Sequence, residues 1–212
     1  MEIKRLALIG PPACGKGTQA DHLIEKFNLK HVSSGAILRE EVKKQSDFGL
    51  MIKPYMDRGE IGPQELITEI VMSFLSKIED RKFLLDGFPR TLYQAKELSK
   101  NNEIDVAISI EVEDASVIER ITGRQTCSTC NRIFHKSFNP SKIENICDSC
   151  NGPLITREDD TIETVKTRLN VFHSQTAEVI DYYKTKGLLR SVNGDQSPDL
   201  VTKEIKSILH ID

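Results

Sequence analysis

The sequence predicts an α/β fold in which a parallel sheet is covered by helices. Two observations predict it. Short apolar runs, each long enough for one buried strand, alternate with segments of helical periodicity along the 212 residues. The first apolar run also passes through a loop rich in glycine and proline directly into a helical segment, which is the order of a strand–helix unit in a parallel sheet.

Taken in chain order, four apolar runs predict buried strands, at residues 6–9, 83–85, 106–112 and 188–192. A helix is expected from residue 15 to about residue 27. A second long helix is expected over residues 161–186, because Asp160 and Glu163 have the spacing of a capping box and Gly187 is a natural stop. Its apolar stripe runs at steps of three and four residues through Val165, Leu169, Phe172, Val179 or Ile180, and Tyr183.

Composition excludes several classes of protein. The net charge of −3 and the isoelectric point near 6.0 give no electrostatic case for binding nucleic acid or an anionic membrane. No apolar stretch approaches the roughly 20 residues that span a bilayer, and the N-terminal run of four is too short for a signal peptide. We therefore expect a soluble, cytoplasmic protein.

Four of the five cysteines form two C-x-x-C pairs separated by sixteen residues, within a polar, turn-rich segment from 123 to about 160 that interrupts the strand and helix alternation. A pair of disulfides, unligated core thiols and a metal site are the alternatives. Because cytoplasmic thiols stay reduced, a zinc site with four thiolates is favoured. Four sulfurs leave no open position for water, so the metal is expected to be structural. The ligands would be Cys127, Cys130, Cys147 and Cys150.

The segment GPPACGKGT, residues 10–18, has the layout of a phosphate-binding loop, G-x-x-x-x-G-K, between a strand and a helix. Backbone N–H groups at the start of a helix face an anion, and Lys16 adds a mobile positive charge. The residue after Lys16 is Gly17, and the hydroxyl follows at Thr18. An ordinary turn rich in glycine and proline, without a binding function, is the alternative. However, strand, loop, lysine and helix occur here in the order of a phosphate-binding loop.

The G-K-G-T variant resembles the nucleoside monophosphate kinases, and the adenylate kinase family in particular. The resemblance extends over nearly the whole chain, through SSGAILRE (33–40), LLDGFPRTLYQA (84–95), RITGR (120–124) and TREDD (156–160). The paired cysteines are similar to the zinc knuckles of the long-lid bacterial members. The resemblance implies a core at 1–32, 63–122 and 161–212, a helical AMP-binding region inserted at 33–62, and a small zinc-containing lid at 123–160.

The activity implied is the reversible transfer of the terminal phosphoryl group from Mg-ATP to AMP, giving two ADP, without a covalent enzyme intermediate. Structural Zn²⁺ and Mg²⁺ are the implied metals, a monomer is implied, and Asp86 would hold Mg²⁺ through water. The implied catalytic residues are Lys16, Arg39, Arg90, Arg124, Arg157 and Arg168. Those for ATP are Ala13, Cys14, Gly15, Lys16, Gly17, Thr18, Arg120, Arg124, Ile133, Phe134 and Gln196. Those for AMP are Ser34, Arg39, Glu60, Ile61, Gly62, Gly87, Phe88, Pro89, Arg90, Gln94, Arg157 and Arg168.

Charged residues near the predicted helix start at 161 leave alternatives open. Arg168 projects toward the apolar face of its helix, where spacing alone allows either a salt bridge or a phosphate contact, and the resemblance favours phosphate. Asp159 and Asp160 could bind metal, but two acids at a helix start also cap it favourably, and we expect capping. From spacing alone, Arg120 and Arg132 belong to a solvated surface.

Three residues depart from the family pattern or stand apart from it. Ala13 replaces a usual glycine, where a positive φ would cost about 1 kcal/mol. Ala36 replaces a frequent aspartate, which leaves the local hydrogen bonding open. Cys14 lies close in sequence to Lys16 and to a helix start, so we expect its thiol to be sensitive to oxidation and protected by ATP.

Two rival functions remain at this stage. A zinc-ribbon nucleic-acid module fused to an ATPase is disfavoured, because residues 123–160 hold five basic and five acidic side chains and four thiolates with Zn²⁺ add −2. A monophosphate kinase with a different base specificity is the closer competitor.

Overall fold

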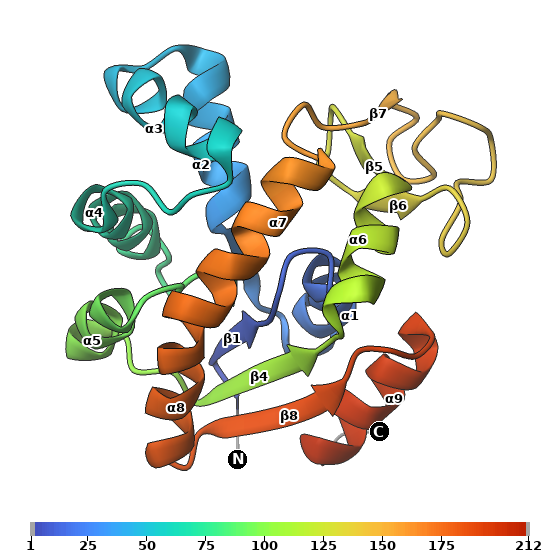
Figure 1. The fold of residues 1–212 in the computed structure, drawn as a ribbon. Helices are drawn as coiled ribbons and strands as arrows, with labels where there is room; N and C mark the ends of the chain where they lie inside the picture. Colours follow the sequence, from blue (N-terminus) through green and yellow to red (C-terminus); the bar gives the residue numbers. More distant parts are fainter. Residues whose placement is uncertain (1–2, 211–212) are drawn as a thin grey trace.

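The computed structural model describes residues 3–210 and confirms the α/β architecture (Figure 1). Five parallel strands form the main sheet in the order β2-β3-β1-β4-β8, with the first strand of the chain at its centre. The ends of the predicted core segments, residues 1–2 and 211–212, lie outside the described residues. The strands are β1 (Arg5–Ile9), β2 (Lys30–Ser33), β3 (Phe83–Asp86), β4 (Val106–Glu111) and β8 (Leu189–Asn193).

All four predicted strands are present within one or two residues of their predicted bounds. The strand that the apolar pattern missed, β2, lies at the edge of the sheet, and its only fully buried residue is Val32. The strand has the sequence KHVS, with a single apolar residue, so no apolar run marks it.

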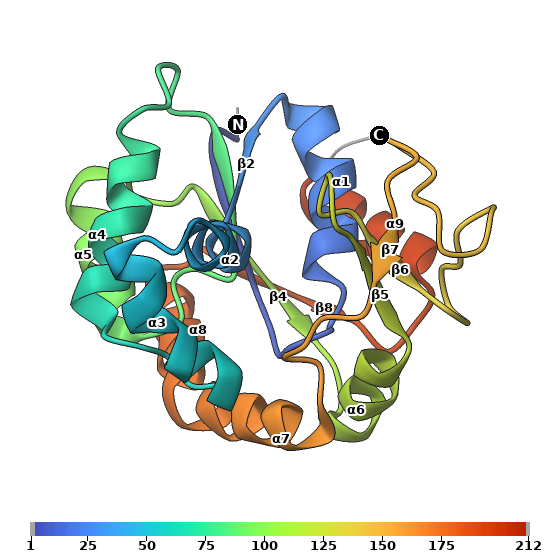
Figure 2. The ribbon, with the colours of Figure 1, turned by 90° about the horizontal axis from the view of Figure 1, so that it is seen from above.

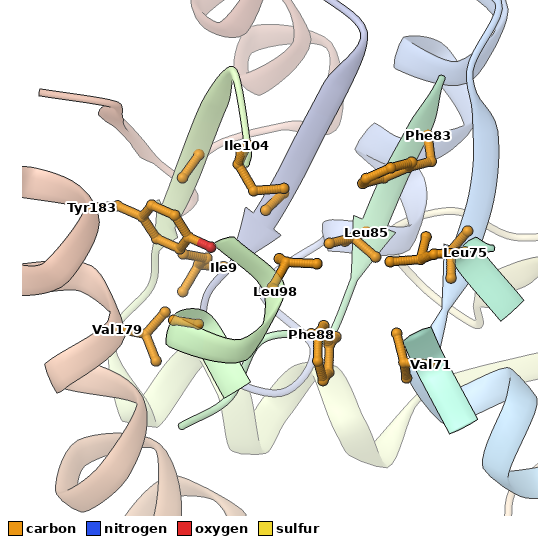
Figure 3. Close-up of a cluster of buried hydrophobic side chains, with 14 of the residues drawn as sticks. Ile9, Val71, Leu75, Phe83, Leu85, Phe88, Leu98, Ile104, Val179 and Tyr183 are labelled. Atoms are coloured by element: carbon orange, nitrogen blue, oxygen red, sulfur yellow. The ribbon is translucent and has the colours of Figure 1, made fainter. Parts of the chain in front are cut away.

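Helices cover both faces of this sheet because alternate strand residues point to opposite sides. Leu6 and Leu8 face a cluster with α1 (Lys16–Phe27) and α9 (Pro198–Ile208), whereas Ala7 and Ile9 face the other helices. Figure 3 shows that second cluster, where Phe83 and Leu85 meet side chains of three helices. These helices are α4 (Gln64–Leu75), α5 (Leu92–Asn101) and α8 (Ala177–Thr185).

The predicted helix at 161–186 forms one helical body with a π turn inside it. It consists of α7 (Ile162–Val171), a π-helical turn η1 (Phe172–Thr176) and α8. Thr176 donates from Oγ1 to the carbonyl oxygen of Arg90, 3.0 Å away, so the turn is tied to the loop after β3. Of the predicted stripe, Val165, Leu169, Val179 and Tyr183 are buried, while Phe172 and Ile180 are half-buried.

The predicted start of this helix was wrong by one residue. Thr161 is the N-cap, and its hydroxyl accepts from the backbone N–H of Thr164 at 3.2 Å. A neutral hydroxyl does the capping, so the carboxylates of Asp159 and Asp160 are free for other partners.

Two groups of elements stand above the carboxyl ends of the sheet strands (Figures 1 and 2). One consists of α2 (Ser34–Lys44) and α3 (Asp47–Arg58). The other is a three-stranded sheet of β5 (Arg124–Cys127), β6 (Ile133–His135) and β7 (Leu154–Ile155), which follows α6 (Asp114–Thr122). Helix α7 lies beside α3 and α6, between the two groups. No helix among residues 3–210 is both long and apolar enough to cross a membrane.

Candidate active site

One large cavity lies between these groups and the carboxyl edge of the main sheet. Its volume is about 1460 Å³, more than the roughly 300–1000 Å³ of a pocket for one small ligand. Every residue predicted to bind ATP or AMP lines it, and so does Asp86. The cavity therefore has room for two nucleotides, and it brings together residues that are up to 183 positions apart in the sequence (Ala13 to Gln196).

The loop after β1 is shaped for an anion. Gly15 is the N-cap of α1 and has φ 100°, a left-handed conformation that costs glycine little. Gly10 lies against Ile110, where a Cβ would be 2.6 Å from the Ile110 carbonyl oxygen. The predicted loop and the predicted helix, which ends at Phe27, are both confirmed.

Lys16 is held inside this loop. Its Nζ donates to the carbonyl oxygens of Gly10 at 2.8 Å and Pro11 at 2.7 Å, and it lies 3.4 Å from Cys14 Sγ. These contacts keep the ammonium group at the site where phosphate would lie. Cys14 is 2% exposed, so its oxidation sensitivity stays a prediction that depends on opening of the loop.

Ala13 adopts the strained conformation that a glycine would adopt freely. Its φ is 55°, in the left-handed region, which costs a residue with a Cβ about 1 kcal/mol. At the other departure, Ala36 donates its backbone N–H to Ser33 Oγ at 3.4 Å, so Ser33 caps α2 without a carboxylate at position 36.

Five of the arginines that line the cavity, those predicted to be catalytic, come from five separate segments. The pKa of Arg90 is lowered to about 10 and that of Arg157 to about 9, mainly by burial and in part by repulsion from neighbouring arginines. Such an assembly of cations is unfavourable without anions between them. The five are Arg39, Arg90, Arg124, Arg157 and Arg168.

Two carboxylates neutralise part of this charge, which corrects our expectation that they cap the helix. Asp160 accepts from Arg124, with Nε 2.7 Å from Oδ2, and Asp159 accepts from Arg168. Although burial opposes it, the charge of Arg168 lowers the pKa of Asp159, so that carboxylate is ionised at neutral pH. Spacing had left a salt bridge open for Arg168, and the structure contains two, with Asp159 and Asp160.

Arg157 differs from Arg124 and Arg168, which are paired with carboxylates. Its Nε donates to Thr126 Oγ1 at 2.9 Å, and no carboxylate among the described residues pairs with it. Like Arg39 and Arg90, which also lack a carboxylate partner within residues 3–210, it can gain charged hydrogen bonds from a bound anion.

Asp86, at the end of β3, faces the same cavity as Thr18. Its Oδ2 lies 3.6 Å from His31 Nε2. Burial opposes ionisation, but the contact with His31 and the charge of Lys16 outweigh it and lower the pKa of Asp86. The carboxylate is therefore ionised and can attract a divalent cation.

At the other end of the cavity, the residues predicted to bind AMP surround the loop after β3. Ser34 donates from Oγ to the carbonyl oxygen of Gly87 at 2.6 Å, and Gln94, 1% exposed, accepts at Oε1 from the Arg90 backbone N–H at 2.7 Å. Gln94 is thereby fixed in position, and its amide nitrogen remains available to a ligand.

Arg120 also belongs to this cavity. Its Nη2 donates to the carbonyl oxygen of Gly194 at 2.8 Å and lies 3.3 Å from Asp195 Oδ1, so the expectation of a purely solvated side chain was wrong. Gln196 instead donates from Nε2 to Glu204 at 2.6 Å, although it lines the cavity as well.

The segment with the cysteines lies directly over the phosphate-binding loop. A Cβ on Gly17 would be 2.7 Å from Ile133 Cδ1, and Arg132 lies 3.6 Å from Asp21 of α1. Sequence reasoning missed two residues here, His135 and Phe138, whose rings pack 4.4 Å apart and line the cavity. Neither residue belongs to a motif, so no sequence signal marked them.

The four paired cysteines converge. Their sulfur atoms all lie within 4.8 Å of one another, and the Cys127–Cys150 and Cys130–Cys147 pairs are 3.4 and 3.6 Å apart. Tetrahedral Zn–S bonds of about 2.3 Å place sulfurs roughly 3.8 Å apart, so the cluster fits this metal. Asn131 and Asn151, which directly follow the second cysteine of each pair, have a left-handed backbone with φ of 62° and 56°.

A loop that cradles phosphate, a cluster of arginines and a cavity for two nucleotides define a P-loop phosphotransferase. The comparisons with known proteins agree. The model of the family described as adenylate kinase matches residues 8–188. Curated adenylate kinases are similar over almost their full length: that of Caldicellulosiruptor bescii is 47% identical over 98% of this chain and 100% of its own, and that of Acetivibrio thermocellus 45% over 97% of each. A relative from Methanocella arvoryzae is 44% identical over 97% of this chain and 98% of its own. The chain belongs to the adenylate kinase family.

Proposed function

We propose that the chain transfers the terminal phosphoryl group of Mg-ATP reversibly to AMP, giving two ADP. The observation that carries this proposal is the single cavity, which joins the phosphate-binding loop to the pocket around Gln94 through five arginines. The names of the relatives support it. Interconversion of adenine nucleotides would make the protein a regulator of nucleotide balance.

The chemistry needs positioning and positive charge more than a protein nucleophile. The phosphate of AMP is itself anionic at neutral pH and attacks directly, so no general base and no covalent intermediate are required. Lys16 and the arginines would hold the two nucleotides in line and stabilise the charge that spreads over the transferring group. Arg168 and Arg124, paired with Asp159 and Asp160 in the structure, would exchange these carboxylates for phosphate oxygens.

Magnesium would neutralise charge on the ATP phosphates. Asp86 is the residue that would hold it, through water, because its carboxylate is ionised and faces the cavity opposite Thr18. On the ATP side, Arg120, His135 and Phe138 offer flat cationic and aromatic faces for the base, and the carbonyl oxygens near Gly194 offer hydrogen-bond acceptors.

Gln94 would recognise the base of AMP, with Nε2 donating to a ring nitrogen while Oε1 accepts from the exocyclic amine. We expect Gln94→Leu to raise KM for AMP about 30-fold, equivalent to about 2 kcal/mol for the lost hydrogen bonds, and to leave KM for ATP unchanged. Gln94→Glu is the matched variant, because it retains an acceptor for the Arg90 N–H but no donor. Steady-state kinetics with each nucleotide varied in turn measures KM for AMP and KM for ATP in each variant. Equal rises of the two KM values would contradict the assignment.

The four-cysteine cluster is proposed to hold structural Zn²⁺ and so to rigidify residues 123–160, which are too few to build a large core. We propose that this lid and the region 33–62 close over bound nucleotides, relative to the core at 1–32, 63–122 and 161–212, and exclude water from the reaction. The contacts of Ile133 and Arg132 with α1 fit a closed lid. A monomer, located in the cytoplasm where thiols stay reduced, completes the proposal.

A zinc-ribbon nucleic-acid ATPase fits this site less well. The cysteine-bearing segment faces the nucleotide cavity instead of a separate basic surface, and its arginines point into that cavity. A monophosphate kinase with a different base specificity would keep the same phosphate machinery and differ near Gln94.

A further inference from the structure

At position 62 a neighbouring side chain leaves room only for glycine. Its backbone φ is not in the left-handed region, so the conformation alone does not require glycine. A Cβ at this position would lie 2.2 Å from Ile52 Cδ1 and 3.4 Å from Tyr55 Cγ. The space that a side chain at position 62 would fill is therefore filled by Ile52, which reaches across from α3.

Ile52 is anchored where it lies. It is 1% exposed and belongs to the core cluster that includes Ile67 and Phe88, whereas its neighbours Leu50 and Met51 on α3 are 59% and 52% exposed. Both Ile52 and Gly62 line the large cavity. One branched side chain on α3 thus forms a part of the cavity wall that the 60–62 segment leaves open.

The position of this wall assigns it to the acceptor nucleotide. Phe88, in the same cluster as Ile52, belongs to the loop from Gly87 to Arg90, which precedes Gln94. Ile61, which precedes Gly62, and Met56, about one helical turn after Ile52, also line the cavity. We propose that Ile52, seated against Gly62, sets the size of the pocket for the base of the acceptor monophosphate and so determines which base is accepted. This inference rests on the proposed function.

The test is a double-mutant cycle with kinetics for AMP, GMP and ATP. Ile52→Ala opens space beside the base. We expect KM for AMP to rise at least about 10-fold, because methyl groups of the pocket wall are lost, and the preference for AMP over GMP to decrease. Gly62→Val introduces the clash and is expected to raise KM for AMP by a similar factor. In Ile52→Ala/Gly62→Val the valine fills the vacated space, so KM for AMP should return to within about threefold of the original value.

Controls separate this role from a loss of folding. Ile52→Val removes a single methyl group and should raise KM for AMP about two- to fivefold with the fold intact, checked by circular dichroism, if Ile52→Ala proves too unstable. Leu50→Ala, an exposed change on the same helix, should alter nothing. KM for ATP should stay within twofold in every folded variant.

Several outcomes would overturn the inference: equal changes in KM for AMP and ATP, single variants within twofold of the original protein, or a double variant whose effects simply multiply. Failure of the proposed function has a different signature. In that case the unsubstituted protein itself would not phosphorylate AMP, and this inference would fail with it.

Discussion

Arg157→Met is expected to lower kcat for AMP phosphorylation about 10³-fold, the smaller end of the effect of a phosphate-stabilising arginine, while the unliganded protein unfolds at an unchanged or higher temperature. The reason is the setting of this side chain, which is half-buried and has a hydroxyl partner but no carboxylate. The positive charge of Arg157 would therefore bind phosphate, and in the unliganded protein it lowers the free energy of unfolding.

The direction of the stability effect follows from the pKa. Burial lowers the pKa of Arg157 to about 9, so the folded protein disfavours the charged form, and that cost applies at neutral pH, well below 9. Methionine fills the same space without a charge to desolvate. The measurement combines steady-state kinetics with thermal unfolding.

The matched control for this prediction is Arg190→Met. Arg190 is exposed and donates to the carbonyl oxygens of Gly187 and Leu189, outside the cavity, so kcat should be unaffected. Retention of activity by Arg157→Met, or a marked loss of stability without a loss of turnover, would show that Arg157 has a structural role.

The second large effect concerns the cysteine cluster. If the cluster holds zinc as proposed, Cys127→Ser should reduce bound zinc from one per chain to near zero. It should also lower the unfolding temperature by about 10 °C, because the metal would supply several kcal/mol of folding free energy to residues 123–160. Burial and the neighbouring thiols raise the pKa of Cys130 to about 12, so four thiolates do not coexist here without a cation. Removal of zinc with a chelator should have a similar effect on the intact protein.

Zinc release with a colorimetric chelator, measured together with thermal unfolding, tests this prediction. Cys14→Ser is the matched control, since Cys14 lies in the phosphate-binding loop far along the chain from the cluster, and it should retain one zinc per chain. Apo and zinc-loaded proteins that unfold at the same temperature would contradict a structural metal.

The sequence predicted elements whose signals are local. The loop at residues 10–18 and the helix after it depend on neighbouring glycine, lysine and apolar residues, and both are present. The two knuckles were predictable because C-x-x-C spacing alone brings sulfurs together, and they converge as expected. The resemblance to a family placed the cavity-lining residues, and all of them line one cavity.

What the sequence did not reveal depends on contacts between distant residues. The edge strand β2 has only one apolar residue and so shows no apolar run. The N-cap at Thr161 depends on the pairing of the Asp159 and Asp160 carboxylates with arginines. The packing of Ile52 against Gly62 spans ten residues and leaves no pattern. Such features follow from three-dimensional packing that periodicity does not report.

The most direct test of the central claim is chromatographic separation of the nucleotides formed when the purified protein is incubated with Mg-ATP and, in turn, AMP, GMP, CMP, UMP or no acceptor. We expect ADP to accumulate with AMP, at two ADP for each AMP consumed, and little reaction otherwise. Preference for another monophosphate would contradict the role of Gln94 while preserving the phosphate machinery. Loss of ATP without any acceptor would contradict a kinase altogether and favour an ATPase.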